Sequence, residues 1–277
     1  MLTLLALASS VCWGTSDFFA GLFSRRRPAV AVVGWTQGLA FVVLCAVVLT
    51  QLGSISWSGW PLWSIGAGFA GLTGLLCFYT ALSTGTMGVV APIAALGVAV
   101  PVLLGVATGD EPSGWTWVGI VVAVVGVTLA SGPELSGAVS ARPVVLAGIA
   151  AVGFGFALFC LDRGARSSTL MTLWGMRCTS VVVFVVVALV ARSVGGVVTR
   201  ELPALLLIGS GDLAANGLFA VASSRGQVSV ASVLGSLFPV ATIVWARFVL
   251  KERLRPIQQL GALLALAGVV IIAVSAT

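Results

Sequence analysis

The sequence predicts an all-α integral membrane protein with ten transmembrane helices, arranged as two inverted five-helix repeats. Three observations support this prediction: the apolar composition, the number of long apolar runs, and an internal repeat. Of the 277 residues, 59% are hydrophobic and 8% are charged, whereas a soluble domain carries about 25% charged residues. The chain lacks the polar surface that a soluble fold needs, so most of its surface is expected to face lipid.

Ten apolar runs are long enough to cross a bilayer. A helix needs about 20 apolar residues to span roughly 30 Å of hydrocarbon, because each residue adds about 1.5 Å. The first run is interpreted as a retained helix, since Arg25, Arg26 and Arg27 follow it, whereas the basic residues of a signal peptide come first. The ten runs cover residues 2–22, 29–50, 61–82, 87–107, 115–132, 143–161, 169–191, 203–223, 228–249 and 256–275.

One pattern of residues occurs twice in the chain. Gly85 and Gly226 each open an apolar run, and each run closes on an acid, Glu111 and Glu252, so that both pairs are 141 residues apart. Each acid is expected to cap the helix that follows it, and Glu252 could instead pair with a neighbouring base such as Arg255. The small residues that match beyond these acids are Gly119, Ala123 and Gly126 in the first copy and Gly261, Ala265 and Gly268 in the second.

The duplication covers the whole chain, since Gly68 also matches Gly209 at the same separation. Each copy holds five runs, an odd number, so the second copy must cross the membrane in the opposite sense. We therefore expect residues 1–135 and 140–277 to form two inverted repeats of one transmembrane unit. Secondary transporters often have this plan, with the solute bound near the membrane midplane between the halves.

Composition also excludes several classes of protein. The net charge is +6, but the basic residues are scattered or lie in short loops, so no nucleic-acid partner is predicted. The five cysteines all lie in apolar runs, and their spacing indicates neither a disulfide framework nor a metal site. Histidine and the GxxxxGK[ST] motif are both absent from the sequence, which removes zinc-protease and nucleotide-driven chemistry. We predict no catalytic residue, no metal and no cofactor.

The loops differ in basic charge. Ten Lys and Arg residues lie in the loops after the first, fifth, seventh and ninth runs, and three lie in the loops after the sixth and eighth. The positive-inside rule places the richer face in the cytoplasm. By this rule both termini would lie outside.

Several motifs resemble the drug/metabolite transporter superfamily, and more narrowly its EamA-type ten-span branch. In the first copy these motifs are Ala-Leu-x-x-Gly beginning at Ala81, the proline-bearing run that follows it, the acid Glu111 at the end of that run, and the Gly-rich run that comes next. The second copy has Leu-Phe-Pro ending at Pro239, then Leu-Lys-Glu-Arg-Leu from Leu250, and Gly261, whereas Val98 stands where a first-copy proline would match Pro239. The resemblance implies export or exchange of small metabolites through a central cavity, with both termini cytoplasmic, opposite to the loop-charge prediction. We expect a multi-pass protein of the plasma (inner) membrane.

Three ionisable residues lie well inside apolar runs: Asp17, Arg177 and Asp212. Charges at this depth are costly, so such residues usually face the bundle interior and mark solute or ion pathways. Neighbours at helical spacing add polar and aromatic groups to the same faces, which suits an amphiphilic solute. The predicted substrate-binding residues are Trp13, Asp17, Gln37, Tyr79, Arg177, Asp212, Asn216 and Phe219.

Asp212 is the candidate proton-linked or cation-binding carboxylate, and Arg177 the candidate partner of an anionic part of the solute. A zwitterion such as an amino acid would suit both residues, and a hydrophobic cation would suit the aspartate and tryptophan alone. In the plainer alternative, Arg177 pairs with Asp212 or Asp17 and only joins two helices. Asp17 could instead lie at the membrane interface in contact with headgroup water.

Other functions are compatible with parts of the sequence. Gly209, Ser210, Gly211 and Asp212 spell GxGD, the signature of intramembrane aspartyl proteases, which need a second aspartate close by to share a proton. Asp17 lacks the tyrosine that normally precedes this partner. A passive facilitator of the same fold and a membrane scaffold are the further alternatives, although a scaffold would not need charges inside its spans.

Overall fold

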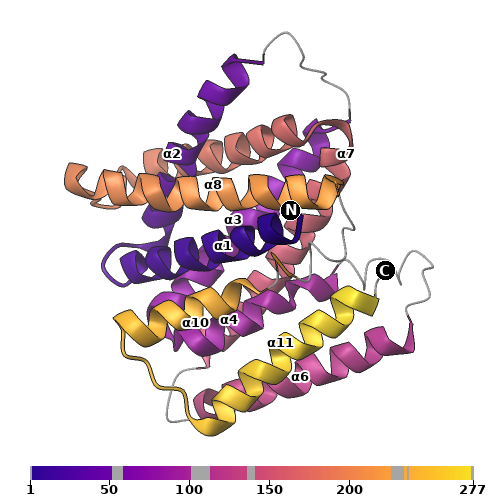
Figure 1. Cartoon of the computed structure of the whole chain (residues 1–277). Helices are drawn as coiled ribbons and strands as arrows, with labels where there is room; N and C mark the ends of the chain where they lie inside the picture. Colours follow the sequence, from indigo (N-terminus) through magenta and orange to yellow (C-terminus); the bar gives the residue numbers. More distant parts are fainter. Residues whose placement is uncertain are drawn as a thin grey trace.

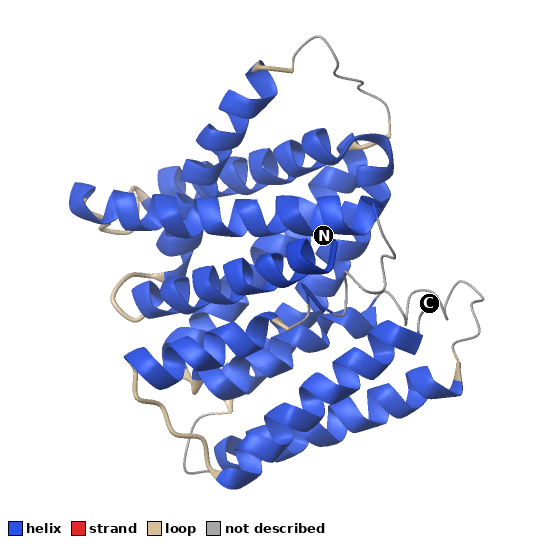
Figure 2. Cartoon of the chain, in the orientation of Figure 1, coloured by secondary structure: helices blue, strands red, loops and turns tan. Residues whose placement is uncertain are grey.

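The computed structural model describes residues 2–51, 59–100, 113–135, 141–225, 234–235 and 237–275, and within these ranges every regular element is helical (Figure 2). The elements are α1 (Leu2–Ser24), α2 (Ala29–Leu49), α3 (Pro61–Thr84), α4 (Met87–Ala95), η2 (Leu96–Val98), α6 (Gly114–Leu135), α7 (Arg142–Ala191), η3 (Thr199–Glu201), α8 (Leu202–Arg225), α10 (Phe238–Val249) and α11 (Pro256–Ser275).

These helices confirm the all-helical membrane fold. In the described part of the chain, five stretches are long and apolar enough to cross a membrane by themselves: Ala29–Leu49, Pro61–Thr84, Arg142–Leu161, Arg163–Ala191 and Thr199–Phe219. Large apolar side chains cover their outer faces, and many of them are exposed. This surface suits lipid and not water.

Helix α7 contains two predicted spans. Its backbone is non-helical at Ser168, so two helices meet there, as the predicted boundary between residues 161 and 169 requires. The predicted runs 87–107 and 228–249 each continue into residues that the structure does not describe, and Glu111 also lies outside the described residues. Within the run 87–107, residues 87–98 form α4 and η2.

The packing of the helices has the two-fold relation that inverted repeats require. Gly14 of α1 lies so close to the carbonyl oxygen of Phe238 that no Cβ would fit between them, and Gly155 of α7 lies in the same way against the carbonyl oxygen of Gly97. Gly14 and Gly155 are equivalent positions of the repeat, and so are Gly97 and Phe238. The same contact therefore occurs once in each direction between the halves.

Helices α6 and α11 repeat this relation with each other at one edge of the bundle (Figure 1). A Cβ added at Gly126 would overlap the backbone nitrogen of Ala265, and one added at Gly268 would overlap the backbone nitrogen of Ala123. Small residues allow such close approach of helices in membranes. The matched small residues in the two copies thus form one symmetric contact, and the structure is the predicted pair of inverted five-helix repeats.

The basic loops gather at one end of the bundle. Arg27, after α1, forms a salt bridge of 3.1 Å with Glu201, before α8, and Trp35 of α2 donates a hydrogen bond of 3.1 Å to the carbonyl oxygen of Val194. The loop between α10 and α11 lies at the same end, whereas the chain termini lie at the other (Figure 1). We call these the basic end and the terminal end.

Candidate functional site

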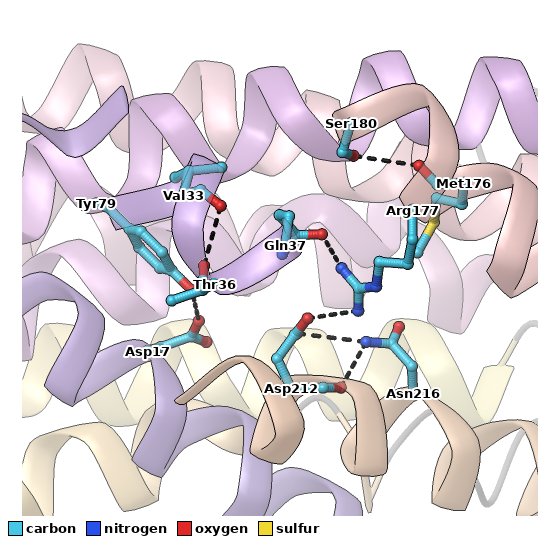
Figure 3. Close-up of polar contacts among 10 residues, drawn as sticks. All are labelled: Asp17, Val33, Thr36, Gln37, Tyr79, Met176, Arg177, Ser180, Asp212 and Asn216. Atoms are coloured by element: carbon cyan, nitrogen blue, oxygen red, sulfur yellow. Dashed lines mark hydrogen bonds and ion pairs between the residues drawn. The ribbon is translucent and has the colours of Figure 1, made fainter. Parts of the chain in front are cut away.

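A buried arginine joins the two halves near the middle of the bundle. The guanidinium of Arg177, on α7, forms a salt bridge of 2.5 Å with the Asp212 carboxylate on α8 and donates a hydrogen bond to the side-chain oxygen of Gln37 on α2 (Figure 3). Only 2% of Arg177 and 7% of Asp212 is exposed. The pairing of Arg177 with Asp212 is one of the two pairings that the sequence left open.

Asn216 completes the coordination of Asp212. Its side-chain amide donates hydrogen bonds to the main-chain carbonyl of Asp212 at 2.7 Å and to the carboxylate at 3.3 Å. The Asp212 carboxylate thus accepts from both Arg177 and Asn216. The Nε of Arg177 is buried and has no hydrogen-bond partner among the described residues, so one charged donor is left for a ligand or for water.

Asp17 is buried beside this group. Its carboxyl accepts a hydrogen bond of 3.3 Å from the Tyr79 hydroxyl, which links α1 to α3 (Figure 3). Only 6% of Asp17 and 1% of Tyr79 is exposed. This burial argues against the alternative in which Asp17 contacts headgroup water.

The two aspartates come together because α1 and α8 pack closely around a glycine. Gly211 lies against the Ser16 hydroxyl, where a Cβ would come to 2.5 Å, and the following residues, Asp17 and Asp212, interact electrostatically. Gly209 packs against the main chain of Thr36. The glycines of the GxGD motif therefore serve helix packing, and Asp212 pairs with Arg177 and not with Asp17, unlike the aspartate pair of a protease.

An aromatic pair lies next to the polar groups on the same two helices. The rings of Trp13 and Phe219 are 5.5 Å apart and tilted by 45°, and both residues are half-buried. The repeat-equivalent residues, Phe154 and Phe78, also pair, with centroids 5.4 Å apart. Sequence reasoning did not include this second pair among the site residues, although the 141-residue match already indicated it.

The charged groups do not follow the two-fold relation. Gly71 occupies the first-copy position that matches Asp212, and Leu158 occupies the second-copy position that matches Asp17. The structure thus has a symmetric aromatic framework with polar groups on one side of it. Such a departure from an internal repeat is expected where function and not packing determines the residue.

A pocket of about 500 Å³ lies away from these residues, at the basic end. It opens between α10 and α11 over the start of α4, and Glu252 is among its lining residues. The N-terminal turn of α11 is capped by Gln258, whose side-chain oxygen accepts a hydrogen bond of 3.0 Å from the backbone N–H of Arg255. The predicted site residues themselves are packed against one another.

Comparison with known proteins identifies the family. The model of the EamA-like transporter family matches residues 1–132 and 141–274. A solved structure described as "Crystal structure of protein" has a TM-score of 0.69 and 18% sequence identity, over 98% of this chain and 94% of that chain. At this identity it supports the fold alone, and no curated protein matches. The chain belongs to the EamA-like transporter family, within the drug/metabolite transporter superfamily, and is a multi-pass membrane transporter of small solutes.

Proposed function

We propose that the protein is a secondary transporter of the plasma membrane that exports a small zwitterionic solute, an amino acid or similar, by alternating access. The observation that supports this proposal is the buried salt bridge between Arg177 and Asp212, with a side chain of the first repeat, Gln37, bonded to the same guanidinium. Solute sites of inverted-repeat transporters lie at such an interface near the midplane.

Charge balance favours a zwitterion at this pair. A solute carboxylate can replace Asp212 on Arg177 while the solute ammonium binds the released Asp212, so that no charge is left unpaired. A solute with one charge separates the pair and leaves either Arg177 or Asp212 buried without a partner, which is unfavourable by several kcal/mol, on the order of 3–5 in proteins. The free Nε of Arg177 gives a planar carboxylate a second donor.

The remaining site residues have roles that suit the same solute. Asn216 already bonds Asp212 and can hold it while the solute exchanges, and Gln37 can orient the guanidinium. Trp13 and Phe219 form an aromatic surface for an apolar side chain of the solute. Export follows by rocking of the two symmetric halves around this site, which is the usual movement of inverted-repeat carriers.

Asp212→Asn is expected to change which solutes stabilise the protein. In the wild type, neutral amino acids should raise the thermal unfolding midpoint in detergent, because a ligand at about 100 times its Kd stabilises by about 2.7 kcal/mol. In the variant the ammonium of the amino acid has no carboxylate to bind, and Arg177 has lost its partner. The carboxylic acid that matches the amino acid but lacks the amine should therefore stabilise the variant better than the amino acid does.

The distant substitution Glu201→Gln serves as the control and should keep the wild-type preference. Stabilisation of the wild type by hydrophobic cations, with no response to amino acids, would contradict the zwitterion proposal and favour the cation alternative. An unchanged order of solutes in Asp212→Asn would show that this pair is not the binding site.

A further inference from the structure

The buried site contains two carboxyl groups and one cation. Among the residues whose burial the structure describes, Arg177 is the one buried basic side chain, and it is already paired with Asp212 at 2.5 Å. Asp17 is equally buried, and its hydrogen-bond partner is a phenol, the hydroxyl of Tyr79. Counting charges therefore leaves one carboxyl, that of Asp17, without a cation.

The groups that face Asp17 from the neighbouring helices do not supply the missing charge. From α8 comes Asp212, whose negative charge opposes a second one, while the Arg177 guanidinium is bonded to Asp212 and Gln37. The hydrogen bonds between α10 and the turn of α1 before Asp17 are neutral, since Trp245 donates to the Thr15 hydroxyl and the hydroxyl of Thr242 bonds the main-chain oxygen of Gly14. A buried carboxylate in such surroundings is strongly unfavourable and is relieved by taking up a proton.

We propose that Asp17, held by Tyr79, is the proton-binding residue of this transporter, and that Asp212 pairs with Arg177 or with the solute and is not the proton carrier. The coupling role rests on the proposed function above. The coupling ion is then a proton, bound next to the solute site and not within it.

The two carboxyls lie close enough to interact electrostatically, which provides a route for coupling. A solute ammonium bound to Asp212 brings a positive charge near Asp17 and favours its charged form. The O–H bond of Asp17 then breaks, its electron pair stays on the carboxylate, and the proton passes to water at the open end. When the solute leaves, Asp17 takes up a proton again. One solute is exchanged for one proton.

Infrared spectroscopy of the protein in lipid tests the proton site without any solute. At neutral pH the wild type should show the C=O stretching band of a buried protonated carboxyl group. Asp17→Asn should lose this band, Tyr79→Phe should keep it at a shifted frequency because a hydrogen bond to the carbonyl is removed, and Glu201→Gln should leave it unchanged. A band that persists in Asp17→Asn overturns the proposal.

Efflux of amino acids from proteoliposomes tests the coupling. Asp17→Asn should still exchange the solute between the two sides but should lose the acceleration that an inward proton gradient gives to the wild type. Acceleration that persists in the variant overturns the proposal, and so does a loss of exchange itself. Failure of the proposed function has a different signature: no amino acid leaves wild-type vesicles, while the infrared band and its loss in Asp17→Asn remain.

Discussion

Arg177→Ala is expected to destabilise the protein by about 3–5 kcal/mol as well as to abolish solute movement. The substitution leaves the Asp212 carboxylate buried, with Asn216 as its remaining side-chain donor, and removes the bond to Gln37 that joins the halves. Breaking a buried ion pair from one side has this large effect because the remaining charge is desolvated and uncompensated. Denaturant titration in mixed micelles measures the free energy of unfolding.

A double variant separates the structural part of this effect from the functional part. Arg177→Leu combined with Asp212→Leu removes both charges and keeps apolar volume, so its stability should return close to that of the wild type, as for other buried pairs replaced by apolar residues. Its solute movement should stay absent. If Arg177→Ala alone is as stable as the wild type, the pair is hydrated and the described burial is wrong.

Gly126→Val is expected to separate α6 from α11. The added side chain would overlap the main chain of Ala265, and a backbone atom cannot move aside as the end of a flexible side chain can. Overpacking of this kind usually costs about 1–3 kcal/mol. The symmetric substitution, Gly268→Val, should cost a similar amount because it meets the main chain of Ala123 in the same way. The thermal unfolding midpoint in detergent measures both.

Gly148→Val is the matched control for this prediction. It makes the same change inside helix α7, but a Cβ at Gly148 meets no atom within 4 Å. Both substitutions exchange glycine for a β-branched residue in a helix, so their difference reports the contact between α6 and α11. Equal midpoints for Gly126→Val and Gly148→Val would show that the two helices are not in the described contact.

The sequence was a good guide to the helices and to how they pair. The 141-residue repeat with five spans in each copy requires inverted halves, and the matched Gly126 and Gly268 lie in reciprocal contacts. The boundary between the two spans of α7 was also placed correctly, with non-helical backbone at Ser168. These features follow from helix length and from residue size, which can be recognised along a single chain.

The partners of the charged residues could not be predicted in the same way. Three ionisable groups inside spans indicated an interior site, but whether Arg177 pairs with Asp212 or with Asp17 depends on how each helix is rotated in the bundle. The close packing of Gly211 on Ser16 decides this rotation, and the contact between Tyr79 and Asp17 follows from the packing of α3 on α1. No local pattern in the sequence specifies either contact.

The central claim is that a small solute crosses the membrane by way of the Arg177–Asp212 pair. It is tested most directly by efflux from proteoliposomes loaded with a mixed pool of amino acids, nucleosides and cationic dyes and followed by mass spectrometry. The wild type should release amino acids selectively, faster with an inward proton gradient, and the double variant Arg177→Leu, Asp212→Leu should release none. Selective efflux that ignores the gradient would indicate a passive facilitator. Efflux by the double variant at the wild-type rate, or none from the wild type, would contradict the claim.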